Sequence, residues 1–180
     1  MFTALLQKLC FAIDKTVMFS GKTAALLMPI LAFVVAYEVF SRYLFDSPTI
    51  WAFDLSLFLF GYIAALGGAY AQQRRAHINV DILYNRVPPK VRSAFNLLTF
   101  SLAIFFLVLI IAMSLGKYEE AIEFNYRRQS EWAPPMFHFW VMMIVASSLF
   151  IAQLGRDLIS EIYFIFTRQV LLAQEHRDGH

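Results

Sequence analysis

A stretch of the chain from Phe95 to Gly116 reads FNLLTFSLAIFFLVLIIAMSLG and contains no ionisable side chain. A helix needs roughly 20 apolar residues to cross the hydrocarbon core of a membrane, and three other segments reach a similar length. Of the 180 residues, 59% are hydrophobic and only 16% are charged, unlike a soluble domain. The sequence therefore predicts an all-α integral membrane protein, a single domain (1–180) with four transmembrane helices at about 23–45, 49–72, 92–116 and 135–155.

Two segments outside these spans have an amphipathic pattern. In residues 1–20, apolar side chains recur at helical spacing around charged residues such as Lys8 and Lys15, which is typical of a helix lying in the membrane interface. Residues 77–90 predict a second, shorter interfacial helix, because Ile78 and Ile82 share a face while Asp81 points elsewhere. Residues 156–180 are expected to form a C-terminal tail.

The distribution of Lys and Arg predicts the orientation. Eleven of the 15 basic residues fall on the side that holds both termini and the middle loop, and four fall on the other side: Arg42, Lys117, Arg127 and Arg128. The positive-inside rule then places both termini, the arm 77–90 and the tail in the cytoplasm. Trp51, Trp132 and Trp140 lie at the opposite, external boundary, where indole rings are enriched. Arg74 and Arg75 mark the cytoplasmic end of the second span.

Two acids lie where a charge is costly. Glu38 falls within the first span, where an unpaired ionised side chain costs on the order of 3 kcal/mol. Arg42 follows one helical turn later, so an intrahelical pair is one explanation, and an ion or proton site is the other. Asp54 lies in the first turns of the second span, where the helix N-terminus favours an anion, or it pairs with Arg42 or a basic residue of a partner.

The second span carries a face of small residues, and its start has a capping pattern. Gly61, Ala65 and Gly68 share this face, which either packs against the chain's own helices or contacts another membrane subunit. Ser47 is expected to cap this helix, with Pro48 in its first turn.

Several classes of function lack support in the sequence. The net charge is only +2, and no basic motif interleaved with aromatic residues indicates nucleic-acid binding. The single Cys10 leaves no disulfide, and the solitary His138 disfavours a haem bundle. No nucleophile, phosphate-loop or metal-helix motif is present, so the sequence predicts neither an enzyme nor a bound cofactor or metal.

The external connection between the third and fourth spans has mixed charge. It is either a solvated face or a docking surface for a soluble partner, and the candidate docking residues are Glu119, Glu123, Arg127, Arg128, Glu131 and Trp132.

The segments SRYLFDSPTIWAFDLS and GGAYAQQRRAHINVDILY resemble the small, DctQ-like membrane subunit of tripartite ATP-independent periplasmic (TRAP) transporters. The resemblance covers roughly Leu26 to Ile165. It implies a location in the bacterial inner membrane and a scaffold for a large subunit that uses a sodium gradient. It also implies transient contact with a periplasmic protein that delivers an organic acid, typically a carboxylate.

Residues expected at an interface with the large subunit are Glu38, Arg42, Trp51, Asp54, Gly61, Ala65, Gly68, Arg74, His77 and Asp81. Two rival hypotheses remain. The first is a self-contained four-helix exporter that uses Glu38, and the second is a purely structural four-span protein without a transport partner.

Overall fold

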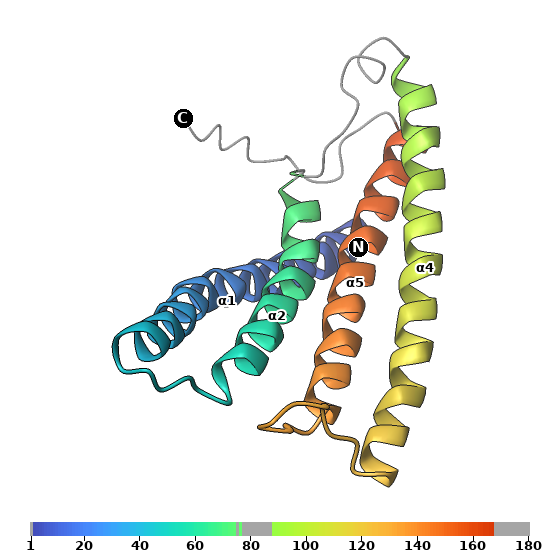
Figure 1. Ribbon diagram of the computed structural model, residues 1–180. Helices are drawn as coiled ribbons and strands as arrows, with labels where there is room; N and C mark the ends of the chain where they lie inside the picture. The colour runs from blue at the N-terminus through green and yellow to red at the C-terminus, as the bar shows by residue number, and fades with distance from the viewer. Residues whose placement is uncertain (1, 75, 77–87, 168–180) are drawn as a thin grey trace.

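The computed structural model describes residues 2–74, 76 and 88–167, and these form four long helices (Figure 1). The helices are α1 (Phe2–Leu44), α2 (Ala52–Gln73), α4 (Pro89–Glu123) and α5 (Phe137–Thr167). Each is long and apolar enough to cross a membrane. The predicted all-α membrane fold with four spanning helices is therefore confirmed.

Helix α4 begins with a proline, whereas the start of α2 differs from the expected one. Pro89 is the first residue of α4, where its missing N–H removes no helical hydrogen bond. Ser47 does not cap α2, because this helix begins only at Ala52 and its start has no side-chain cap. Instead the Ser47 amide donates to the Ser41 carbonyl, at 3.1 Å, and closes the turn after α1.

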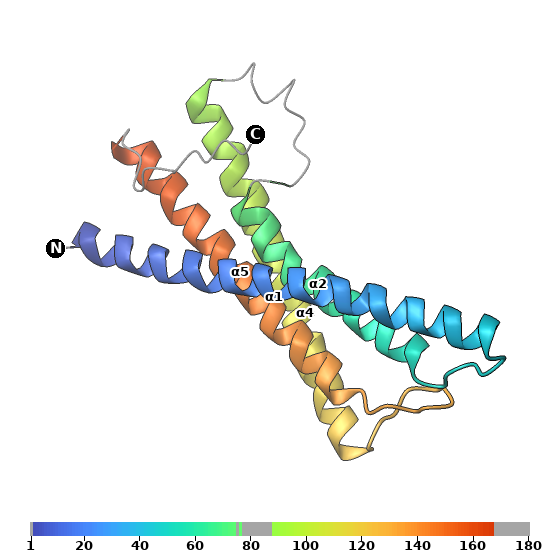
Figure 2. The ribbon, with the colours of Figure 1, turned by 90° about the vertical axis from the view of Figure 1, so that its left-hand side faces the viewer.

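The sequence had predicted a separate helix over the first 20 residues. Instead, helix α1 is continuous over 43 residues and includes them from Phe2 on. At 1.5 Å per residue it is about 64 Å long, roughly twice the thickness of a hydrocarbon core. Figure 2 shows that α1 crosses the other helices at a wide angle. Its N-terminal half packs on them through Cys10 and Val17, both 0% exposed. The placement of this half in the membrane interface stays a prediction.

Helix α5 continues beyond the predicted fourth span. Residues 156–167, which were expected to belong to the tail, are helical, and residues 168–180 lie outside the described part. Most of the predicted arm, at 77–87, also lies outside it.

Helix α5 is the centre of the fold. It packs along α4 on one side and against α2 and α1 on the other. Ala24, Leu66 and Ala146 form a small core where α1, α2 and α5 meet, and a second core joins α1 to α2 around Leu59. The connections 45–51 and 124–136 lie at the same end of the molecule, as Figure 1 shows. We call it the predicted external end, and the opposite end the predicted cytoplasmic end.

Candidate functional site

The Glu38 carboxylate joins the last turns of α1 to the connection before α2. Its Oε1 accepts from Nε of Arg42 at 3.1 Å, and its Oε2 accepts from the backbone N–H of Thr49 at 3.0 Å and from the Thr49 hydroxyl. The predicted pair of Glu38 and Arg42 is therefore confirmed. Both carboxylate oxygens are bonded within the chain, so Glu38 acts as a structural link in this state.

Asp54 is 1% exposed and pairs with a residue from a distant loop. Its Oδ1 lies 2.7 Å from Nε of Arg128, and the Ser130 hydroxyl donates to its Oδ2. The Ser130 hydroxyl oxygen also accepts from the backbone N–H of Ala133, at 3.2 Å. The basic partner of Asp54 is therefore Arg128 of the same chain, and Arg42 instead pairs with Glu38.

The connection 124–136 is a compact hairpin. Arg127 and Pro135 form an isolated antiparallel bridge, and the Met136 N–H donates to the Tyr126 carbonyl at 3.0 Å. Arg127 also donates from Nη1 to the Ala133 carbonyl at 3.2 Å. Because its backbone bonds internally and Arg128 anchors it to α2, this hairpin presents a defined surface.

The predicted docking residues divide into two groups in the structure. Arg128 turns inward to Asp54 and is partly buried. The others lie exposed at the predicted external end: Glu119, Glu123, Arg127, Glu131 and Trp132. Together they place acidic side chains, one basic side chain and one indole ring on a surface that the hairpin contacts hold in position. Whether a soluble partner docks here stays a prediction.

The small-residue face of α2 packs against α5. A Cβ atom at Gly61 would lie 3.3 Å from the Phe139 ring, and one at Gly68 would lie 3.4 Å from the Phe150 ring. Ala65 packs against the core shared by α1, α2 and α5. Of the two sequence explanations, the structure therefore shows packing within the chain.

An aromatic contact lies further along the same pair of helices. The Tyr62 hydroxyl of α2 hydrogen-bonds Nδ1 of His138 in α5, and the Phe58 ring meets the imidazole edge-on with 4.7 Å between centroids. His138 is therefore not solitary, because a tyrosine and a phenylalanine from α2 hold it. The contact between Tyr62 and His138 could not be predicted from the sequence, because the two residues are far apart in it and neither belongs to a recognisable motif.

Trp51 and Arg74 lie at opposite ends of α2. The Trp51 ring stacks on Tyr37 of α1 with 5.9 Å between centroids. The Arg74 side chain donates from Nε to the Tyr70 hydroxyl at 3.0 Å. His77 and Asp81, the remaining interface candidates, lie outside the described residues.

Tyr70 also lies where α1 and α2 come close together. A Cβ atom at Gly21 would lie only 2.3 Å from Cγ of Tyr70, so only glycine fits where the helices cross. Gly21 is separated from the small-residue face in the sequence, and it was not among the predicted contacts.

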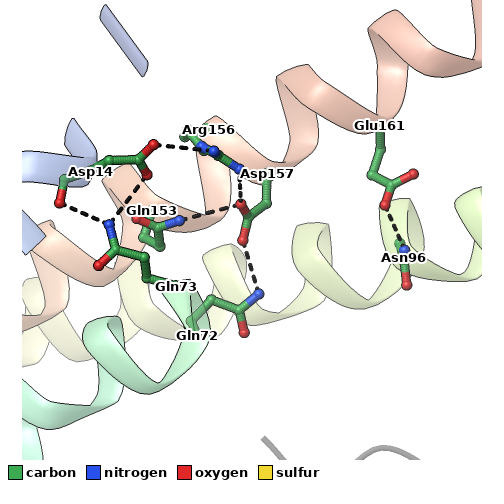
Figure 3. Close-up of polar contacts among 8 residues, drawn as sticks. All are labelled: Asp14, Gln72, Gln73, Asn96, Gln153, Arg156, Asp157 and Glu161. Atoms are coloured by element: carbon green, nitrogen blue, oxygen red, sulfur yellow. Dashed lines mark hydrogen bonds and ion pairs between the residues drawn. The ribbon is translucent and has the colours of Figure 1, made fainter. Parts of the chain in front are cut away.

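A polar cluster that was not predicted from the sequence ties three helices together at the predicted cytoplasmic end (Figure 3). Arg156 of α5 contacts Asp14 of α1 and its neighbour Asp157, both at 3.1 Å. From α2, Gln73 donates to the carbonyl and carboxylate of Asp14, and Gln72 donates to Asp157 at 3.0 Å. We call these five residues the inner cluster.

Further polar contacts extend this end of the bundle. Gln153, 1% exposed, donates to Asp157 at 3.3 Å, and Asn96 of α4 donates to Glu161 of α5 at 2.7 Å. Figure 3 shows that these contacts run along one side of α5. The acids are matched by amides and one guanidinium, an arrangement suited to joining helices. Among residues 2–74, 76 and 88–167, no three His, Cys, Asp or Glu side chains come together as metal ligands.

A family model described as the DctQ component of tripartite ATP-independent periplasmic transporters matches residues 31–163. This chain therefore belongs to the DctQ family. The matched range contains the Glu38 link, the Asp54–Arg128 pair and Arg156, whereas Asp14 precedes it. DctQ-family proteins are subunits of transporters and not enzymes, and the four apolar helices agree with a multi-pass protein of the bacterial inner membrane.

Three curated relatives are similar in sequence to this chain. The C4-dicarboxylate TRAP transporter small permease protein DctQ of Vibrio cholerae is 28% identical over 87 residues, 48% of this chain and 38% of the relative. The sialic acid TRAP transporter small permease protein SiaQ of Vibrio cholerae is 33% identical over 95 residues, 53% of each chain. The sialic acid TRAP transporter permease protein SiaT of Haemophilus influenzae is 31% identical over 83 residues, 46% of this chain and 13% of the relative. The matched part thus spans less than two thirds of each of these three relatives.

Proposed function

We propose that this DctQ-family chain scaffolds the large, sodium-coupled subunit of a TRAP transporter for the uptake of an organic acid. A periplasmic binding protein would deliver that acid. The chain itself would contribute neither the substrate site nor the sodium site. The observation that carries the proposal is that buried and partly buried polar contacts join the helices and the hairpin 124–136 at both ends of the bundle.

The contacts at the two ends make the bundle suited to a fixed support. At the predicted external end, Asp54 and Arg128 join α2 to the hairpin 124–136. At the predicted cytoplasmic end, Arg156 bridges Asp14 of α1 and Asp157 of α5. In a dry interior a charged side chain that loses its partner is costly, so movement that separates these helices is disfavoured. A scaffold must resist such movement.

The outer surfaces of α1 and α4 suit contact with lipid and with a further membrane subunit. In each of these two helices, only 11% of the most apolar 18-residue stretch is buried within the chain. Large side chains remain exposed there, among them Phe33 and Phe40 on α1, and Phe105 and Met113 on α4. These faces leave ample area for a larger partner, because the chain's own helices do not cover them.

The names of the relatives support the partner and the substrate class. The segment similar to this chain makes up 13% of the permease protein SiaT, so such a segment also occurs within a much longer permease. The relatives are named for C4-dicarboxylates and for sialic acid, and both are organic acids that carry a carboxylate. We therefore propose a carboxylate substrate for the complex.

The proposal is tested by co-expressing this chain with the large TRAP permease encoded in the same genome. Both are purified in mild detergent and reconstituted into vesicles. The periplasmic binding protein, loaded with the acid, is added outside the vesicles. We expect co-purification, and uptake of labelled acid that requires an inward sodium gradient and both chains. C4-dicarboxylates and sialic acid serve as the first probes. Vesicles with potassium in place of sodium are the control.

Glu38→Gln distinguishes the rival exporter. If Glu38 is a structural link, the variant weakens the joint between α1 and Thr49 but leaves sodium dependence unchanged. Solute transport by this chain alone, abolished by Glu38→Gln, would overturn the scaffold proposal in favour of an exporter. Failure to co-purify with any large permease would favour a purely structural protein.

A further inference from the structure

Three lysines form a stripe on the outward face of α1. Lys8, Lys15 and Lys22 are spaced seven residues apart, close to two helical turns, and all three are exposed. The opposite face is buried against the bundle, as Cys10 and Val17 show with 0% exposure. We call these three residues the lysine stripe. It therefore points away from the chain's own helices.

Within the part of the chain that the structure describes, no acid neutralises this stripe. The only acid among the first 22 residues is Asp14, and its carboxylate turns inward to Arg156 and Gln73. None of the three lysines makes an ion pair with a described residue. Three positive charges thus remain along about 21 Å of helix, from Lys8 to Lys22.

The same outward face changes its chemistry after residue 22. Its next positions at intervals of seven are Pro29, Ala36 and Tyr43, which are exposed and uncharged. A face that is cationic over its first part and then apolar matches the step from lipid headgroups to hydrocarbon, because lysine is costly in the hydrocarbon. Residues 8–22 therefore belong at a membrane surface.

The contacts of α1 place this segment at the predicted cytoplasmic end of the bundle. Asp14 meets Arg156 and Gln73 in the inner cluster, and Gly21 lies against Tyr70. These residues lie at the predicted cytoplasmic end, where α2 stops at Gln73. The lysine stripe therefore lies level with the headgroups expected at the predicted cytoplasmic end. Exposed Phe11 and Phe19 flank the stripe, one on each side, and aromatic side chains beside a basic face are typical of helices lying in the interface.

We propose that the lysine stripe binds the headgroups of anionic phospholipids of the cytoplasmic leaflet. The lysines place ammonium groups at the phosphates, and the two phenylalanines reach toward the acyl chains. Such binding holds the N-terminal half of α1 against the membrane surface, where its buried face supports α2 and α5. The ligand class is a phospholipid with net negative charge, with phosphatidylglycerol as the probe.

The test uses the full chain in mild detergent, mixed with equal amounts of phosphatidylglycerol and phosphatidylcholine. The retained lipids are quantified by mass spectrometry after isolation of the protein. We expect the wild type to retain phosphatidylglycerol preferentially, and K8Q/K15Q/K22Q to lower that preference by about fivefold or more. A factor of five corresponds to about 1 kcal/mol, the contribution of one lysine near an anionic surface.

Two matched variants serve as controls. K8R/K15R/K22R keeps the charge and should retain the lipid preference. Lys117→Gln removes a lysine at the predicted external end, where Glu120 already pairs with it, and should also leave the preference unchanged. High salt should weaken the preference of the wild type, because exposed charges are screened.

The proposal fails if K8Q/K15Q/K22Q folds, judged by its unfolding temperature, and retains the wild-type lipid ratio. It also fails if the arginine variant loses the preference, or if high salt has no effect on the wild type. If the glutamine variant keeps its lipid preference but no longer co-purifies with the large permease in phosphatidylcholine alone, the stripe binds an acidic protein surface instead. Single variants, beginning with Lys15→Gln, show which lysine matters most.

Discussion

Asp54 at the start of α2 is bound to Arg128 of the hairpin between α4 and α5, with 2.7 Å between Oδ1 and Nε. The contact fixes the position of this hairpin relative to α2, although α4 itself packs chiefly on α5. It also holds the exposed residues of the hairpin, such as Glu131 and Trp132, in one place. The surface on which a soluble partner would dock is thus coupled to α2 through the Asp54 carboxylate, which binds both Arg128 and Ser130 of the hairpin.

Breaking this pair should destabilise the whole chain. Arg128→Gln leaves the buried Asp54 carboxylate without its counter-charge, and we expect a loss of about 3 kcal/mol, the low end for a buried pair because Arg128 is 31% exposed. The measurement is the unfolding temperature in detergent. Arg127→Gln is the control, since its exposed side chain donates to the Ala133 carbonyl and forms no ion pair with a described residue, and its effect should be small. Equal effects of the two variants would contradict the argument.

The sequence was sufficient wherever the relevant contact is local. The four spans follow from long apolar runs, because lipid requires each crossing segment to satisfy its own backbone. The pair of Glu38 and Arg42 follows from helical spacing, since residues four apart share a face. Both could be predicted without knowing which helices are neighbours.

The sequence was insufficient where charges are satisfied by another helix. Hydropathy drops after Gly155 because Arg156 and Asp157 follow, so the helix was expected to end there. It continues to Thr167, since Asp14 and Gln72 from other helices bond those two residues. The same reasoning explains the single α1. Lys8, Lys15 and Lys22 lie on its outward face and Asp14 points inward, so these charges lower the hydropathy of the segment without ending the helix.

Gly21 should tolerate no larger side chain. A Cβ at this position would overlap the Tyr70 ring, so Gly21→Ala forces α1 and α2 apart, and we expect a loss of about 1–3 kcal/mol. Gly116→Ala is the matched control, because nothing lies within 4 Å of its Cβ and alanine is the better helix former. Its unfolding temperature should be equal or higher. Adding Tyr70→Ala to Gly21→Ala should recover part of the loss, and no recovery would contradict a clash at this crossing.

The small-residue face of α2 can be tested with three glycines of one helix. Gly61→Leu and Gly68→Leu place a large side chain against Phe139 and Phe150 of α5, so we expect both to lower the unfolding temperature of the isolated chain. Gly67→Leu is the control, since a Cβ there meets nothing within 4 Å. If Gly67→Leu leaves the chain stable but prevents assembly with a large permease, Gly67 lies at the interface between subunits. Unchanged stability of the first two variants would show that α2 and α5 are less closely packed than described.

Arg156 should be the most sensitive position at the predicted cytoplasmic end. Its guanidinium lies between Asp14 and Asp157, so Arg156→Gln leaves two partly buried carboxylates facing each other without a counter-charge. We expect a loss of about 3 kcal/mol in the free energy of unfolding.

Adding Asp14→Asn removes one of the two charges and should restore part of the stability, a non-additive result in a double-mutant cycle measured by thermal unfolding. Arg74→Gln is the control, because among the described residues its exposed side chain contacts Tyr70 alone, and the variant should unfold close to the wild-type temperature. Strict additivity of Arg156→Gln and Asp14→Asn would mean that the two residues do not interact, and that the amides of Gln72 and Gln73 hold α2 to its neighbours without help from the charges.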